Sequence, residues 1–438
     1  MTPEVKNRIA QIRRGEVPEG YKRGKIGIFP LDWEETQLKK LFVRQNRRNA
    51  INNTNVLTIS AQYGLISQEK FFNKDIASED KSNYYLLERG DFAYNKSYSN
   101  GYPFGAIKSL KKYEKGIVSP LYICFTPSEK NKCPDYYEHY FESGLLNHEI
   151  QAIAQEGARN HGLLNIAVGD FFNSLIVAPP AAEQQKIASI LSTQDKIIDL
   201  KERLLEEKKQ QKKYLMQQLL TGKKRLPGFS EEWENFGFND VFCTLPTNTL
   251  SREDMCKSGG IIRNIHYGDV LIHYGEVLNI NEEDVPYIIE GKEPAHYMQV
   301  ENGDVIIADT AEDMTVGKTT EIQNIKTDKV VSGLHTICCR PIKKYFCEGW
   351  LGYYMNSEEY HGQIKRLACG SKVFSISKTE IKKTRLRIPC INEQKEIIDI
   401  LSTKNREIAL SEQSIKAEKQ KKKALMQLLL TGIVRVKI

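Results

Sequence analysis

Apolar residues recur every seven positions along two long segments of the chain, and polar residues fill most positions between them. A lysine interrupts each stripe once, at Lys212 and Lys422. Such a stripe is typical of a helix that packs one face against a partner. No proline or glycine falls between Glu183 and Thr221, which permits one unbroken helix of about 60 Å at about 1.5 Å per residue. The residues predicted to pack the helices are Leu191, Ile198, Leu205 and Leu219 in the first segment and Leu401, Ile408, Ile415 and Leu429 in the second.

The two striped segments are copies of one another. Residues 183–222 align with residues 393–432 without a gap, at an offset of 210, and 21 of the 40 aligned positions are identical. Proline precedes each copy, and Gly222 and Gly432 stand where a glycine usually ends a helix. One such helix cannot bury its stripe alone. We therefore predict that the copies pair antiparallel and give the chain approximate two-fold symmetry.

Two globular segments, residues 31–180 and 226–390, differ far more than the helices do. Short β-rich stretches alternate in them with Gly, Asn and Ser turns, which predicts mixed α+β domains with mainly antiparallel strands. They still share an order of motifs: an opening tryptophan, a Gly-Asp turn that enters a strand, and a Val-Ser segment before an apolar strand. These motifs lie at Trp33, Gly90–Asp91 and Ser119, and again at Trp233, Gly303–Asp304 and Ser332.

Composition limits the class of protein. A chain of 438 residues, 40% apolar and 27% charged, should hold two or three domains with their own cores. No apolar run approaches a membrane span, and the first residues lack the apolar core of a signal peptide, so we expect a cytoplasmic protein and no membrane partner. Nine cysteines without a CxxC pair indicate reduced thiols and no zinc site.

The net charge of +7 is unevenly spread. Residues 31–180 balance, and residues 226–390 carry eighteen Lys or Arg against twenty-four Asp or Glu, which gives −6. The excess of positive charge therefore lies in the helical segments and near the N-terminus. If DNA is the partner, phosphate neutralisation has to come from local loops, from the helices or from another subunit.

The repeated order of these features resembles the specificity subunit of type I restriction–modification enzymes. It combines the opening tryptophan, the Gly-Asp strand, the Val-Ser strand, a proline before a helix that begins Glu-Gln, and a helix that ends LMQ-x-LLTG. Residues 261–270 and 303–322 also resemble target-recognition domains of that family. The resemblance implies the following parts: an N-terminal segment 1–25, target-recognition domains 26–181 and 225–390, a central conserved helix 182–224 and a C-terminal conserved helix 391–438.

The same resemblance implies the partners. Each domain would bind one half of a bipartite, asymmetric target in double-stranded DNA, and the helices would separate the domains. Two methyltransferase subunits would dock on the helices and methylate adenine, and a restriction subunit that translocates DNA would join for cleavage. S-adenosylmethionine, Mg and ATP are then expected on those partners, with no cofactor in this chain. The first 30 residues supply no complete third helix and would at most cap the structure.

The chain lacks the usual signals of catalysis. An adenine methyltransferase needs an Asn/Asp-Pro-Pro-aromatic loop, whereas the only Pro-Pro here, Pro179–Pro180, lies between alanines. The stretch that ends Gly317–Lys318–Thr319 is similar to a P-loop, but its required first glycine is Glu312. No metal-ligand spacing is found among the eight histidines. We therefore predict a non-catalytic DNA-recognition subunit.

Base recognition needs Arg, Lys, Asn, Gln, Ser or Thr on loops that reach a groove edge. Loops of this kind occur in both domains, although polar loops are also common on surfaces that contact nothing. Tyr98 and Tyr102 could equally pack their loop against their own domain. The predicted DNA-contact residues are Gln45, Asn46, Arg47, Arg48, Lys96, Tyr98, Asn100 and Lys108 in the first domain and Arg263, His266, Lys318, Thr319, Ser371 and Lys372 in the second.

Two alternatives belong to other classes. Four acidic residues at 304–313 could form a metal-dependent nuclease site, which metal-dependent cleavage by the purified chain would support. The chain could also be a structural coiled-coil scaffold, which would self-associate and bind no DNA. The diverged globular segments on matched helices argue against both, because neither role requires two unlike domains on one repeated support.

Overall fold

The computed structural model divides into two compact units. Unit 1 contains residues 1–202 and 413–438, and unit 2 contains residues 203–412. The described residues are 2–60, 64–69, 80–99, 101–128, 133–156, 162 and 164–437. No helix in these ranges is long and apolar enough to cross a membrane.

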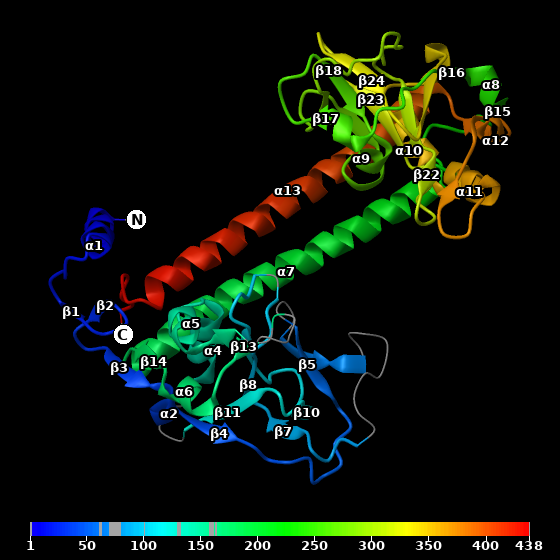
Figure 1. Ribbon diagram of the computed structural model, residues 1–438. Helices are drawn as coiled ribbons and strands as arrows, with labels where there is room; N and C mark the ends of the chain where they lie inside the picture. The colour runs from blue at the N-terminus through cyan, green and yellow to red at the C-terminus, as the bar shows by residue number, and fades with distance from the viewer. Residues whose placement is uncertain are drawn as a thin grey trace. The chain divides into compact units, whose positions relative to one another are not determined.

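The two predicted helices are present and have the same length. Helix α7 spans Ala181–Leu219 and α13 spans Ile391–Leu429, each 39 residues long, so that the offset of 210 holds at both ends (Figure 1). Gly222 has φ 68° and Gly432 has φ 71°, a left-handed conformation that favours glycine and ends each helix as predicted.

Each unit contains one half of each helix, and the halves pair antiparallel. In unit 1, Lys422 Nζ lies 2.6 Å from Asp195 Oδ1, and Lys201 Nζ donates to Ser414 Oγ at 2.8 Å. In unit 2, Lys209 pairs with Glu412 at 2.7 Å. Partner numbers fall on one helix as they rise on the other, which defines the antiparallel direction. Buried stripe residues are Leu191, Ile198, Leu219, Leu401, Ile415 and Leu429, and half-buried ones are Leu205 and Ile408.

Unit 1 packs an antiparallel sheet in the order β4-β11-β8-β9 against helices. Phe42, Phe92 and Phe125 of this sheet share one core with Tyr137 of α4 and Leu191 of α7. The elements of its globular part are α1 Pro3–Arg13, β1 Tyr21–Arg23, β2 Ile28–Pro30, β3 Glu34–Gln37, α2 Leu38–Leu41, β4 Phe42–Gln45, β5 Leu57–Ser60, β6 Gly64–Ser67, β7 Tyr85–Glu88, β8 Phe92–Asn95, β9 Ala106–Ser109, β10 Lys115–Val118, β11 Ile123–Pro127, α4 Pro134–Glu142, α5 Asn147–Ile153, β12 Gln155–Glu156, β13 Leu164–Asn165, α6 Val168–Asn173 and β14 Leu175–Ala178.

Unit 2 has a five-stranded sheet, β16-β25-β21-β23-β19, beside a four-stranded sheet, β17-β20-β18-β24. The pairs β18–β24 and β19–β23 are parallel and the other strand pairs described for this unit are antiparallel, in line with the mainly antiparallel strands that we expected. The elements of its globular part are β15 Glu234–Gly237, α8 Phe238–Val241, β16 Phe242–Leu245, η1 Arg252–Asp254, β17 Met255–Cys256, β18 Ile262–Ile265, α9 Tyr267–Ile272, β19 Val277–Asn279, β20 Tyr287–Ile288, β21 Val305–Ala308, β22 Thr310–Ala311, β23 Thr319–Gln323, β24 Lys329–Ser332, β25 Thr336–Pro341, η2 Lys343–Tyr345, α10 Trp350–Met355, α11 Glu358–Leu367, β26 Phe374–Ser375, α12 Lys378–Ile381 and β27 Arg385–Ile388.

A buried carboxylate joins helix and domain in each unit, in the same way. In unit 2, Glu393 in the first turn of α13 accepts from Trp233 Nε1 at 3.2 Å and from Arg225 at 2.7 Å through each of two nitrogens. In unit 1, Glu183 in the first turn of α7 accepts from Trp33 Nε1 at 2.9 Å and from Arg435 at 2.8 Å. The motif tryptophans therefore attach each domain to the start of the helix that follows it.

The two units differ in where the arginine that pairs with the buried carboxylate lies in the chain. Arg225 follows the end of α7 and leads directly into the domain of unit 2. In unit 1 the corresponding residues come from the far end of the chain. Tyr21 Oη donates to the carbonyl of Gly432 at 2.7 Å, and Arg8 of α1 donates to the carbonyl of Ile433 at 2.6 Å. The N-terminal segment thus holds the C-terminal residues, a capping role close to the expected one.

Candidate nucleic-acid interface

In unit 1 the loops with the most polar residues meet at one end of the sheet. Gln45, the last residue of β4, lies opposite Cys124, near the beginning of β11, and Asn95, the last residue of β8, lies opposite Ala106, the first of β9. The segments 46–49, 96–99, 101–105 and 119–122 therefore leave the sheet at the same end. We call this end of the sheet the loop end of unit 1. Loops on a rigid sheet are the usual place for recognition residues.

Several predicted residues at this loop end are accessible. Asn46 and Arg48 are exposed, and the Arg48 guanidinium lies 5.0 Å from the centre of the Tyr85 ring while donating to the carbonyl of Asn83. Tyr98 is 62% exposed, with its backbone N–H bound to the carbonyl of Gly162. An exposed aromatic ring and a guanidinium on ordered backbone suit contact with bases or phosphates.

The other predicted residues of unit 1 have different surroundings. Arg47 forms ion pairs with Glu88 and Asp91, and Lys108 is buried in an ion pair with Glu142. Both cations are therefore neutralised within the domain. Gln45 and Lys96 are half-buried at the loop end, and Asn100 lies outside the described residues.

Unit 2 has a corresponding loop end. Its β16, β21, β18 and β24 finish there and β25 begins there. Predicted residues Ser371 and Lys372 are exposed on a hairpin whose strand β26 pairs with β22 beside it. These two residues are accessible in the way that base or phosphate contact requires.

Arg263 and His266 are engaged within unit 2. Arg263 donates to Asp328 at 3.1 Å and to the carbonyl of Ile280 at 2.7 Å. His266 is buried at the start of α9, where its Nδ1 accepts from the N–H of Gly268 at 3.2 Å. Burial lowers the pKa of His266, which keeps the ring neutral and able to accept this bond.

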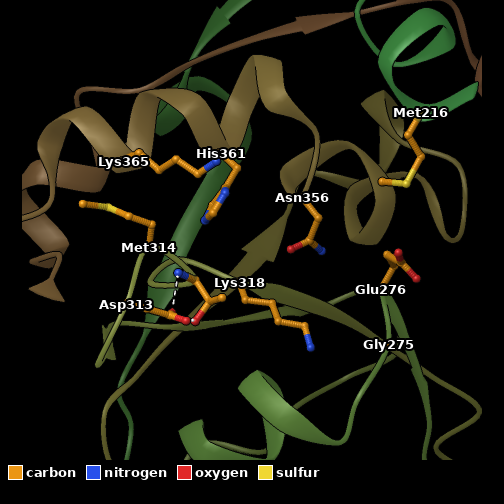
Figure 2. Close-up of a pocket in the computed structure, with 10 residues that line it drawn as sticks. Met216, Gly275, Glu276, Asp313, Met314, Lys318, Asn356, His361 and Lys365 are labelled. Atoms are coloured by element: carbon orange, nitrogen blue, oxygen red, sulfur yellow. Dashed lines mark hydrogen bonds between the residues drawn. The ribbon is translucent and has the colours of Figure 1, made fainter. Parts of the chain in front are cut away.

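Lys318 lines a cavity of about 690 Å³ within unit 2 (Figure 2), and Thr319 follows it in the chain. The Lys318 ammonium donates to the carbonyl of Leu271 at 2.9 Å, and burial lowers its pKa. His361 of α11 and Met314 of the neighbouring loop also line the cavity. Thr319 is fully buried, with its N–H bound to Asn356 at 3.0 Å, so its side chain is not available to DNA in this conformation.

The acidic residues of 304–313 do not converge on one point. Asp304 is buried and pairs with Arg340 through bonds of 2.9 and 2.8 Å, whereas Asp313 accepts from the N–H of Thr315 at 2.8 Å. Within the described ranges, no group of three His, Cys, Asp or Glu side chains is arranged to hold a metal ion. Asp304 and Asp313 are therefore used in hydrogen bonds within the domain, which is a structural role.

Two residues at the loop end of unit 2 were not among the predicted contacts. Tyr267 and His335 lie together there, with ring centres 5.3 Å apart. A signal for His335 existed, since it follows the second Val-Ser motif by three residues just as Tyr122 follows Ser119 in unit 1. Only the fold shows that this turn lies beside Asp309 and Tyr267.

Comparison with known proteins agrees with this architecture. Residues 30–210 and 230–419 each match the family model described as the type I restriction modification DNA specificity domain. The chain belongs to this family. The two matched stretches cover both domains and most of both long helices, so the family assignment rests on nearly the whole chain, as the resemblance predicted.

Two curated members of the family come from Methanocaldococcus jannaschii. One, a putative type I restriction enzyme MjaX specificity subunit, is 25% identical over 96% of this chain and 97% of its own length. The other, the type I restriction enzyme MjaVIII specificity subunit, is 24% identical over 74% of this chain and 76% of its own.

A solved structure shares the fold. It is described as the structural basis of complex assembly and conformational transition of the type I R-M system, and it aligns at a TM-score of 0.58 with 16% identity. The alignment covers 93% of this chain and 99% of the solved one. The predicted α+β fold with two long helices is thereby confirmed.

Proposed function

We propose that this chain selects the DNA sequence on which a type I restriction–modification complex acts, and that it is not itself a catalyst. The observation that carries the proposal is the doubled specificity domain, with exposed polar loops at one sheet end in each copy. The two loop ends differ in residue type, so they fit two different half-sites. The target is then bipartite and asymmetric.

The chemistry belongs to other subunits in this proposal. A methyltransferase would use S-adenosylmethionine to modify adenine, and a restriction subunit would use ATP and Mg for translocation and cleavage. The supporting observation is that the acidic residues most suited to metal binding are used in internal bonds. Since its substrate would be the host's own DNA, the complex would work in the cytoplasm.

The long helices offer a place for two copies of one partner. Leu200 on α7 is 63% exposed, and Leu410, its equivalent at the offset of 210, is 59% exposed on α13. Each unit thus presents an exposed leucine at the same position of a repeated helix. Two identical methyltransferase subunits would bind such a pair of equivalent surfaces. Leu200→Glu and Leu410→Glu should each lower the number of bound methyltransferase subunits from two to one, as counted by native mass spectrometry.

Mapping of N6-methyladenine in the host genome by long-read sequencing, with and without this gene, tests the central proposal. A split motif, methylated on both strands and lost on deletion, is the expected result. Exchange of residues 31–180 for another such domain should change one half-site only. The modular proposal fails if both half-sites change together, and the specificity proposal fails if deletion leaves every methylated motif intact.

A further inference from the structure

His335 has a backbone conformation that is uncommon among residues other than glycine. It occupies the turn between β24 and β25 with φ 54°, a left-handed conformation that a non-glycine residue rarely adopts. The other non-glycine residues with positive φ in the described ranges are Asn52 and Asn324, and asparagine tolerates this conformation well. Strain of this kind persists only where surrounding structure imposes it, and it concentrates at functional sites.

Specific hydrogen bonds hold the backbone of this turn in place. Ser332 Oγ lies 2.7 Å from Thr336 Oγ1, and Thr336 Oγ1 donates to the carbonyl of Gly333 at 2.5 Å. The carbonyl of His335 accepts from the N–H of Asp309 at 3.1 Å. The turn is closed on both sides, so the imidazole is held at the loop end with 48% of its side chain exposed.

The surroundings of the ring select one tautomer. His335 Nδ1 lies 3.4 Å from Asp309 Oδ1 and 3.4 Å from Thr310 Oγ1. The Thr310 hydroxyl donates its own proton to Asp309 Oδ1 at 2.7 Å, so both oxygens face Nδ1 as acceptors. A proton on Nδ1 satisfies this arrangement. Nε2 of the neutral ring is then an acceptor, because the bond made by one ring nitrogen sets the role of the other.

Tyr267 fixes the orientation of the ring from another side. Its ring meets the imidazole edge to face, at 5.3 Å and 76°. The corresponding residue of unit 1, Tyr122, instead packs against the small core around Leu87 and Val118. This loop end therefore has a feature that unit 1 does not share, as a domain with its own half-site requires.

We infer that His335 determines specificity for one base pair of the half-site bound by unit 2, by accepting a hydrogen bond at Nε2 from an exocyclic amino group in the major groove. The inference rests on the proposed function. The amino groups on that edge are N6 of adenine and N4 of cytosine.

The test compares His335→Asn and His335→Gly with a matched control. Asparagine and glycine both accept the positive φ, so neither adds backbone strain. The control is His273→Asn, which alters a histidine of the same domain that is also exposed and also lies beside an aspartate, Asp269, but has an ordinary φ of −103°. Methylation motifs of the whole complex are mapped for the three variants. The rates of methylation by the whole complex are then measured on DNA duplexes in which single base pairs of the target are substituted.

We expect both His335 variants to lower the preference for the cognate base at one position by roughly 2- to 10-fold, the size of one neutral hydrogen bond. The other half-site and the spacing should stay unchanged, and the control should keep the full motif. An unaltered motif in both variants would overturn the inference, as would equal relaxation in the control. Absence of any split motif with the unmodified chain would instead refute the proposed function. If His335→Asn loses activity altogether, His335→Gly decides, because it relieves strain and should raise or preserve the Tm.

Discussion

Removal of Arg225 should destabilise unit 2 strongly, because it leaves a carboxylate buried without its cation. Glu393 is 1% exposed, and Arg225 donates to both of its oxygens at 2.7 Å. Breaking a buried pair on one side costs about 3–5 kcal/mol. The remaining bond from Trp233 and the position of Glu393 in the first turn of α13 offset roughly 1 kcal/mol of this. We therefore expect Arg225→Leu to lower the free energy of unfolding of unit 2 by about 2–4 kcal/mol.

Tryptophan fluorescence during urea unfolding can measure this loss in unit 2 alone. The chain has three tryptophans, and Trp33 is the one in unit 1. In a Trp33→Phe background the signal comes from Trp233 and Trp350, whose ring centres lie 6.1 Å apart in the core of unit 2. The matched control is Arg387→Leu. Arg387 also lies over Trp233, at 5.7 Å, but its ion pair with Glu359 is solvent-exposed and should contribute at most about 1 kcal/mol.

A double-mutant cycle with Glu393→Gln separates charge burial from lost packing. The amide keeps an acceptor for Trp233 but leaves no charge in need of Arg225. The double variant should therefore be more stable than the sum of the single losses predicts, by at least about 1.5 kcal/mol. Additive losses, or a loss below about 1 kcal/mol for Arg225→Leu alone, would refute this account of the carboxylate.

Three further predictions concern other sites. Burial raises the pKa of Glu321 to about 7, although hydrogen bonds from the N–H groups of Gly349 and Gly352 act in the opposite direction. The stability that this carboxyl contributes is therefore full below about pH 4.5 and is lost as the pH rises through 7. Between about pH 5 and about pH 8, the free energy of unfolding of unit 2 in urea should fall by about 2–3 kcal/mol more in the unmodified protein than in the Glu321→Gln variant, and an equal fall in both would contradict this prediction. Gly317→Ala should lower the free energy of unfolding by about 2–4 kcal/mol, because the residue has φ 85° and an added Cβ would lie 2.4 Å from Ile364. The control Gly303→Ala, where φ is 92° and no atom lies near the added Cβ, should lower it by about 1 kcal/mol in the same melts. Arg48→Ala should weaken DNA binding by the assembled complex and reduce the slope of log affinity against log salt by about 1, while an unchanged slope would exclude a phosphate contact.

The repeated helices could be predicted almost to the residue. Heptad spacing, a missing helix breaker and a terminal glycine are local signals, and the stretch without Pro or Gly, 183–221, lies within two residues of α7 at either end. The helical parts predicted as 182–224 and 391–438, in contrast, extend five and nine residues past the ends of α7 and α13. Two stripe positions, Leu205 and Ile408, are only half-buried, a difference that periodicity cannot show. The family followed from the order of motifs, because order survives where residue identity has diverged.

The candidate DNA contacts were harder to predict, because they depend on pairings between distant strands. Lys108 has the composition of a DNA contact, yet the register of β8 and β9 places it where Glu142 neutralises it. His335 was marked in the sequence by its position after the second Val-Ser motif alone, and the pairing of β21 with β25 makes it a candidate by bringing Asp309 beside it. Residue type alone predicts which loops are polar, but not which of their side chains remain available.

The place of the C-terminal residues in unit 1 has a consequence for biosynthesis. Arg435, Gly432 and the last part of α13 complete the core and the buried carboxylate of a unit whose domain is translated first. The whole of unit 2, residues 203–412, is made in between. At roughly 5–20 residues per second, the ribosome needs on the order of 10–40 s to make those residues. The first domain to be made thus waits with part of its apolar surface uncovered, while the second can close on its own helices, so unit 1 is the part of the nascent chain that most needs a chaperone.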